Sequence, residues 1–233
     1  MNPQAAIEAA KIAAETAARN TIITGIVAIV TIIITSIISI RTARKSNELA
    51  KDLGEKNLKA LEQKRYIDAI SAERVKWIND MRDRFSEYLK LAHIQMNDLD
   101  KLKFDILAKG ETHPEVKKSA LELRDRYFEI VYVSNYIFLL LNPKEPVTEK
   151  LIGLHEEITT ALNIKNINAF KYGDCEQVVK DSSYFHQVIL KAEWKRVKEE
   201  NKKGEEIDDA ATNDIYITIA KKLDEDVYNK YFS

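Results

Sequence analysis

Residues 21–40 read TIITGIVAIVTIIITSIISI, and the nearest charged side chains on either side are Arg19 and Arg41. Isoleucine and valine fill most of the positions in this stretch. At about 1.5 Å rise per residue, a helix of this length spans roughly 30 Å, the thickness of the hydrocarbon core of a bilayer. A helix also satisfies its backbone hydrogen bonds internally, as lipid requires. We therefore expect a transmembrane helix over residues 21–40.

A cleaved signal peptide is the main alternative for this stretch. Signal peptides have a basic start, an apolar region of about 7–15 residues and a small-residue cleavage site. Here Glu8 and Glu15 balance Lys11 and Arg19, and the apolar run is longer than that. The end of the run, Ser39-Ile40-Arg41, is also a poor cleavage context. We expect an uncleaved anchor.

The distribution of basic residues predicts the orientation of this anchor. Two basic residues precede the span, whereas eight follow it within the next 25 residues. Because basic flanks stay on the cytoplasmic side, we expect a single-pass protein of the inner (plasma) membrane, with the N-terminus outside and the C-terminal part cytosolic. The single Cys175 agrees with a reducing compartment. The net charge of −1 offers no general attraction to nucleic acid, so we do not expect direct binding of nucleic acid.

One side of the expected span is polar. Small or hydroxylated residues recur every three or four positions and so share one stripe of a helix. Three interpretations remain open: the hydroxyls bond back to their own helix, the stripe is a helix-packing seam, or several copies line a water-accessible pore with it. The last two both predict a homo-oligomer. These candidate pore-lining or helix-packing residues, called the hydroxyl stripe, are Thr21, Thr24, Ala28, Thr31, Thr35 and Ser39.

The rest of the chain also has helical periodicity. We expect a short extracytoplasmic helical segment over residues 1–20, rich in alanine, and a charged juxtamembrane helical stalk over residues 41–65. Apolar residues at i, i+3 and i+4 predict a cytosolic helical bundle over residues 66–203. A C-terminal extension over residues 204–233 is expected to be helical, although residues 216–219 (YITI) have strand preferences. The predicted class is all-α, with one N-terminal transmembrane helix followed by a cytosolic helical bundle.

Residues 74–85, RVKWINDMRDRF, mix arginine with aromatic side chains, as RNA-stacking segments do. Helical spacing, however, places Trp77, Ile78, Met81 and Phe85 on one face. This pattern favours a contribution to the core.

Sequence motifs of catalysis are absent. The chain has no glycine-rich phosphate loop, no HExxH and no CxxC, and its four histidines show no metal-ligand spacing. Ribonucleases of the HEPN type carry an arginine four to six residues before a histidine. The nearest equivalent is Lys150 with His155, and lysine does not reproduce the guanidinium fork. We expect no enzyme, no cofactor and no metal, and keep Lys150 and His155 as degenerate HEPN-like candidates.

Two stretches, AERVKWINDMRDRFSEYL (residues 72–89) and YIFLLLNPKEP (residues 136–146), follow the apolar span. Together they resemble a loose family of small bacterial membrane proteins from defence or mobile-element loci. The layout is also similar to that of the membrane-anchored accessory proteins of type VI-B CRISPR systems. This resemblance covers roughly residues 20–200, with Lys150 and His155 at the place of the degenerate HEPN-like motif. It implies a ring-shaped membrane pore that reinforces RNA-guided antiviral defence.

The expected function is therefore an oligomeric membrane pore or membrane-perturbing effector in bacterial antiviral, CRISPR-associated defence, gated by its cytosolic helical domain. The alternative is a non-conducting membrane anchor or scaffold for a cytosolic partner. A degenerate HEPN-like ribonuclease is third. The expected partners are further copies of the chain, the lipid bilayer and a cytosolic defence partner.

Overall fold

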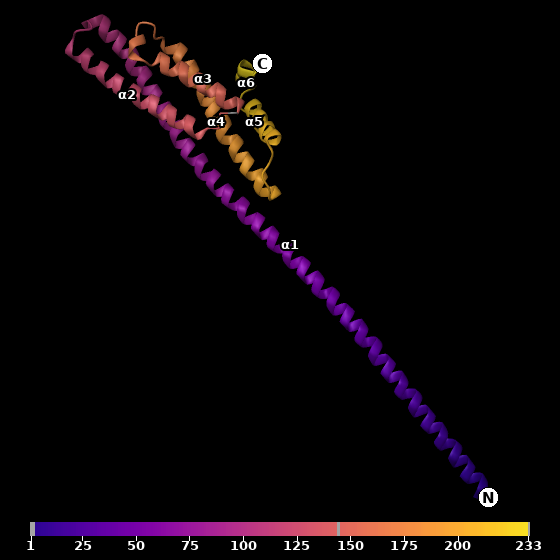
Figure 1. Cartoon of the computed structure of the whole chain (residues 1–233). Coiled ribbons are helices and arrows are strands. Elements are labelled where there is room, and N and C mark those ends of the chain that lie inside the picture. Colours follow the sequence, from indigo (N-terminus) through magenta and orange to yellow (C-terminus); the bar gives the residue numbers. More distant parts are fainter. Residues whose placement is uncertain (1–2, 144, 233) are drawn as a thin grey trace. The chain divides into compact units, whose positions relative to one another are not determined.

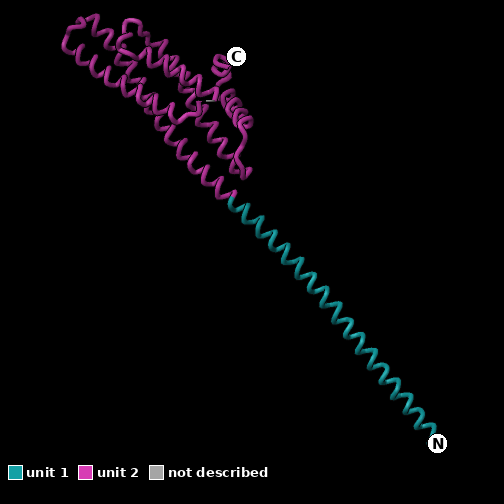
Figure 2. The backbone as a smooth tube through the Cα atoms, viewed as in Figure 1, with its two compact units in different colours: residues 1–62 teal, residues 63–233 magenta. Residues whose placement is uncertain are grey.

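The computed structural model describes residues 3–143 and 145–232, and these residues form six α-helices and one short 3-10 helix without any strand (Figure 1). The predicted all-α class is thereby confirmed. The chain divides into two compact units, residues 1–62 and residues 63–233 (Figure 2). Helix α1 (Pro3–Lys109) contributes to both units.

Unit 1 contains the described residues 3–62, all of them helical and all exposed. Pro3 suits the first position of a helix, where its missing N–H is not needed. The alanines that follow are the strongest helix formers. Gly54 lies inside the helix and does not end it, because one glycine costs only about 1 kcal/mol relative to alanine.

Unit 2 begins with the C-terminal part of α1 and continues through the remaining helices. These are α2 (Pro114–Leu140), α3 (Pro146–Ala161), the 3-10 helix η1 (Ile164–Asn166), α4 (Tyr172–Lys203), α5 (Asp209–Leu223) and α6 (Glu225–Phe232). Helix α4 is central, because α3 and α5 both pack along it. Helix α2 packs on α3, and α6 packs on α5. Apolar side chains from α1 to α5 form one buried cluster.

Capping residues and backbone geometry set several helix ends in unit 2. Helix α2 starts at Pro114, and the side chain of His113 accepts a hydrogen bond from the backbone N–H of Glu115. Helix α4 ends where Gly204 adopts φ = 73° and donates its N–H to the carbonyl of Glu200 at 2.8 Å. A left-handed residue of this kind terminates helices, and glycine adopts it without strain.

The apolar face of residues 74–85 forms part of the core. Ile78, Met81 and Phe85 are each at most 2% exposed, and Trp77 is half-buried with its indole N–H donated to the carbonyl of Leu140 at 3.0 Å. The strand-like residues 216–219 lie within helix α5.

Candidate functional site

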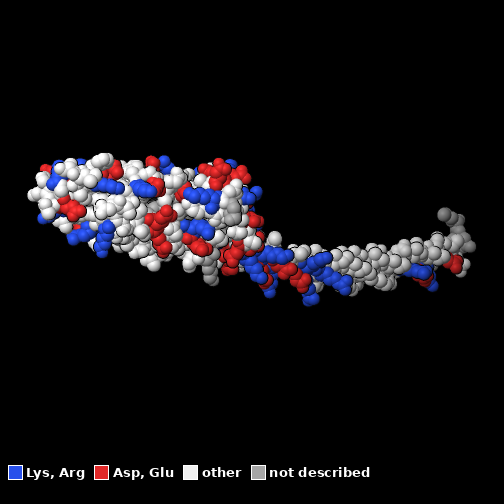
Figure 3. Space-filling view, turned by 90° about the horizontal axis from the view of Figure 1, so that it is seen from above, with Lys and Arg blue, Asp and Glu red and all other residues white. Residues whose placement is uncertain are grey.

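The apolar residues of the stretch 21–40 are all exposed in the structure. Its isoleucines and valines retain 47–64% of their side-chain exposure. An 18-residue window of α1 has a mean hydropathy of 2.6, and none of that window is buried, so by length and composition this helix is able to cross a membrane. In Figure 3 charged side chains gather on either side of an uncharged stretch of unit 1.

The hydroxyl stripe occupies a narrow sector of this helix. With successive residues about 100° apart, its six members fall within an arc of about 80°. No isoleucine or valine of residues 21–40 falls inside that arc. All six members are exposed, and Gly25, next to the stripe, has no other atoms around the place of a Cβ. The stripe is therefore a continuous polar, small-residue surface.

The threonine hydroxyls of the stripe are bonded within their own helix. Each donates to the carbonyl oxygen four residues earlier, at 2.8–2.9 Å. Each oxygen keeps acceptor capacity for water or for a neighbouring helix. This local bonding is what the first of the three interpretations predicts, and it is also compatible with a packing seam or a pore lining. The donors are Thr21, Thr24, Thr31 and Thr35.

The HEPN-like candidates lie on helix α3 of unit 2. Lys150 is half-buried, whereas His155 is 0% exposed. The His155 imidazole stacks on the Tyr88 ring with the ring centroids 3.9 Å apart. A fully buried imidazole of this kind does not reach an RNA phosphate at the surface.

His155 is part of a buried chain of polar groups that the sequence did not indicate. Its Nδ1 lies 2.9 Å from Ser134 Oγ, and its Nε2 lies 3.1 Å from Nε2 of His186. The His186 ring stacks on Phe85 with the centroids 3.8 Å apart. Burial lowers the pKa of His155 to about 3. Burial and the neighbouring His155 hold the pKa of His186 well below its ordinary value. Both imidazoles are therefore neutral near pH 7.

Ser134, His155 and His186 are connected in the order in which a nucleophile meets its base. Their environment, however, does not favour hydrolysis. Ser134 lies inside helix α2, where the backbone N–H groups are used by the helix and supply no oxyanion hole. An imidazole whose pKa is about 3 is also a weak general base. We interpret the cluster as a structural element that fixes how α2, α3 and α4 pack.

No group of three or more metal-ligating side chains is found within residues 3–143 and 145–232. His155 and His186 meet because each occupies a core-facing position of its helix, next to Leu154 and Phe185 respectively. The sequence indicated the burial of these two histidines only by placing each of them on the apolar face of a helix.

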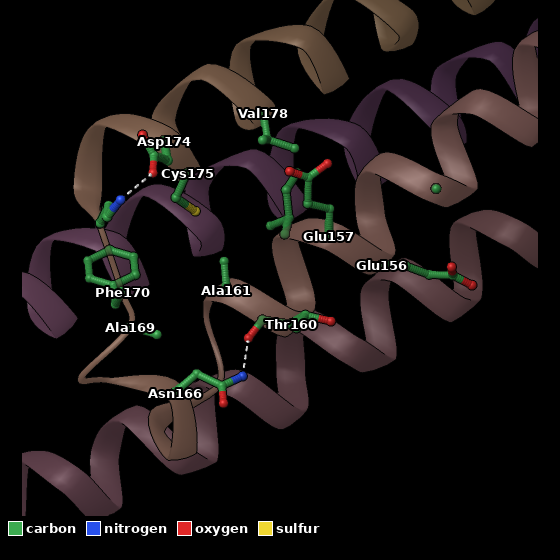
Figure 4. Close-up of a pocket in the computed structure, with 13 residues that line it drawn as sticks. Glu156, Glu157, Thr160, Ala161, Asn166, Ala169, Phe170, Asp174, Cys175 and Val178 are labelled. Atoms are coloured by element: carbon green, nitrogen blue, oxygen red, sulfur yellow. Dashed lines mark hydrogen bonds and ion pairs between the residues drawn. The ribbon is translucent and has the colours of Figure 1, made fainter.

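A cavity of about 510 Å³ lies between α3, the loop after it and the start of α4 (Figure 4). Phe170 and Cys175 form part of its wall, and Lys171 pairs with Asp174 at 3.6 Å on its rim. Burial raises the pKa of the Cys175 thiol to about 11. Because the thiolate is the reactive form, Cys175 is not a nucleophile at neutral pH.

Helix α2 carries a second exposed apolar surface. Leu121, Phe128, Tyr132 and Leu139 are 52–85% exposed. On a helix they lie within an arc of about 40°. Large exposed apolar patches are the kind of surface through which proteins contact other molecules. We call these four residues the α2 apolar stripe.

Unit 1 thus presents an exposed apolar helix with a polar sector, and unit 2 presents a neutral histidine pair, cavities and an apolar stripe. Of these features, the sequence predicted the first and not the others. Comparison with protein-family models, curated proteins and solved structures finds no match for this chain.

Proposed function

We propose that this chain is a single-span membrane protein whose copies assemble through the hydroxyl stripe into a pore, with unit 2 as a cytosolic helical bundle that gates it. The observation that carries the proposal is the fully exposed, uncharged stretch of residues 21–40 with its polar sector. The assignment to bacterial antiviral defence is supported by the sequence resemblance described above.

Insertion is supported by the composition of the stretch. Its isoleucines and valines, twelve in number, each favour insertion, by about 0.3 to 0.6 kcal/mol for those at the centre of a membrane helix. In water the same side chains remain exposed. Because the threonine donors are satisfied within the helix, the stripe adds little cost to insertion.

Assembly is supported by the placement of the polar side chains. A solitary anchor gains nothing from having its hydroxyls in one sector, whereas helices in a membrane pack closely where residues are small and polar. Hydroxyl oxygens also hydrate a lumen without the large cost of a charge in the membrane. The α2 apolar stripe supports further contacts of unit 2, either with other copies or with a cytosolic partner.

The second candidate is a non-conducting anchor that holds a cytosolic partner at the membrane. The internal bonding of the threonine hydroxyls favours it, because such residues need no second helix. The full burial of His155 weighs against the third candidate, a ribonuclease.

A triple substitution of the stripe tests the pore. Thr24, Thr31 and Thr35 are each replaced with leucine, and the protein is reconstituted into liposomes loaded with a self-quenching dye. The matched control is Ile23→Leu, Val30→Leu and Ile34→Leu, which introduces the same leucines on the opposite side of the helix. We expect the stripe variant to insert normally and lose dye release, and the control to keep it.

Equal dye release from the stripe variant and the wild type would contradict the pore. The absence of release from all three proteins, combined with retained cellular activity after exchange for an unrelated span, would support the anchor. Mass measurement of the detergent-solubilised protein gives an independent test, since a monomer excludes assembly through the stripe.

A further inference from the structure

A second large cavity of unit 2, about 610 Å³, lies between α1, the connection from α2 to α3, α4 and α5. A neighbouring cavity of about 440 Å³ shares Asn142, Glu145, Arg196 and Tyr216 with it. Cavities of this size accommodate small organic molecules. The side chains around these shared residues determine which class of ligand the cavities bind.

Two arginines and two glutamates form a closed ring of ion pairs beside the cavity. Arg74 pairs with Glu200 and, at 3.5 Å, with Glu193. Arg196 pairs with the same two carboxylates, at 3.0 Å from Glu200 and 3.7 Å from Glu193. Both glutamate side chains are at most 8% exposed. The two guanidinium groups are neutralised by the two carboxylates. They therefore do not select an anionic ligand.

Glu145 adds a further carboxylate to this neutral ring. Its Oε1 accepts a hydrogen bond from Asn142 at 3.3 Å, and it also interacts with the Tyr216 hydroxyl, which donates to Glu193 at 2.9 Å. Within residues 3–143 and 145–232, no lysine or arginine lies within ion-pair distance of Glu145, although the charge of Arg196 also acts on it. Burial and the like-charged Glu193 raise the pKa of Glu145. Burial and Glu193 thus disfavour the ionised form of Glu145, and a cation beside its carboxylate would stabilise that form.

Other residues that line the cavity are aromatic or aliphatic. They include Ile70, Leu140 and Trp77, whose ring is held in place by the hydrogen bond from its indole N–H to the Leu140 carbonyl. Tyr66 lies at the same cavity and is 58% exposed. Aromatic faces attract ammonium groups, and the aliphatic side chains favour an apolar body.

We propose that this cavity binds a small organic cation, with its ammonium group against the Glu145 carboxylate and its apolar body against Trp77, Ile70 and Leu140. The site is independent of the proposed pore, because all its residues belong to unit 2 and none to the apolar span.

The test uses the full-length protein in a detergent with a neutral sugar headgroup. The chain has two tryptophans, so a Trp194→Phe background leaves Trp77 as the only indole fluorophore. Benzylammonium is titrated against the Trp77 emission, with benzyl alcohol as the neutral probe and benzoate as the anionic one. Circular dichroism checks that each variant stays helical. Three variants are compared: Glu145→Gln removes the charge without changing the shape, Glu73→Gln removes an exposed rim carboxylate, and Ala69→Phe fills the cavity.

We expect saturable binding of benzylammonium, at least about tenfold stronger than that of the other two probes, which is the effect of about one ion pair. Glu145→Gln is expected to abolish this preference, Glu73→Gln to change it less than about twofold, and Ala69→Phe to weaken all binding. Equal binding of the three probes, a preference for benzoate, or an unchanged preference in Glu145→Gln would overturn the proposal. So would the absence of saturable binding up to about 10 mM probe.

Discussion

Acidification from pH 7 to pH 5 is expected to destabilise unit 2 mainly through the histidine pair. In the folded protein His155 stays neutral until about pH 3, and the pKa of His186 is also well below its ordinary value. In the unfolded chain both imidazoles bind a proton below about pH 6.5. The unfolded state therefore binds more protons than the folded state throughout this range, and the stability falls as the pH falls.

The magnitude follows from the difference in proton binding. An imidazole with an unfolded pKa of about 6.5 that stays neutral when folded costs about 1.9 kcal/mol between pH 7 and pH 5. The pair His155 and His186 together cost about 4 kcal/mol, a large part of the 5–15 kcal/mol that stabilises an ordinary domain. Both side chains are at most 3% exposed, so solvent does not reduce the effect.

Urea denaturation at pH 7 and pH 5, followed by tryptophan fluorescence, measures this loss, because Trp77 and Trp194 both belong to unit 2. A double variant, His155→Gln with His186→Gln, is expected to be less stable at pH 7 and to lose about 4 kcal/mol of the pH dependence. His93→Gln changes an exposed imidazole and serves as the control that keeps it. If the double variant and the wild type lose the same free energy on acidification, the reasoning is refuted.

Three further substitutions have defined outcomes. Glu200→Ala removes one of the two carboxylates that Arg74 and Arg196 share and should lower the free energy of unfolding by about 1–3 kcal/mol in urea denaturation. Glu199→Ala, which removes the carboxylate paired with Lys195, should change it little and serves as the control. Gly204→Ala places a Cβ on a left-handed backbone, φ = 73°, and should lower the free energy of unfolding of unit 2 by about 1–2 kcal/mol in the same assay. No loss would show that the helix end relaxes freely. Asp181→Ala removes the carboxylate that Lys230 and Tyr231 contact, so limited proteolysis should cut α6 faster than in the wild type, and an unchanged rate would show that apolar packing alone holds α6.

The sequence was sufficient for features that depend on neighbouring residues. Periodic apolar positions predicted that the chain is helical, and the boundary placed at residue 204 coincides with the end of α4, because a glycine acts on the backbone next to it. The break between α5 and α6 was not predicted. There Asp224 ends α5, and its side chain accepts a hydrogen bond from the N–H of Val227 at the start of α6.

Residues 216–219 have strand preferences but form part of helix α5. In the structure Tyr216 is 5% exposed, and its hydroxyl donates to Glu193 on α4. Packing of α5 along α4 therefore overrides the β-propensity of an isolated segment, which depends on its surroundings.

The amino-acid sequence by itself determined the all-α class, the uncharged stretch of residues 21–40 and the polar sector on it, because these follow from composition and a period of 3.6 residues. Only the tertiary structure brought His155 to His186, 31 residues away, and Arg74 to Glu200, 126 residues away. Contacts of this range depend on which faces of separate helices meet. The packing of the whole core decides which faces meet, and a local sequence pattern does not predict it.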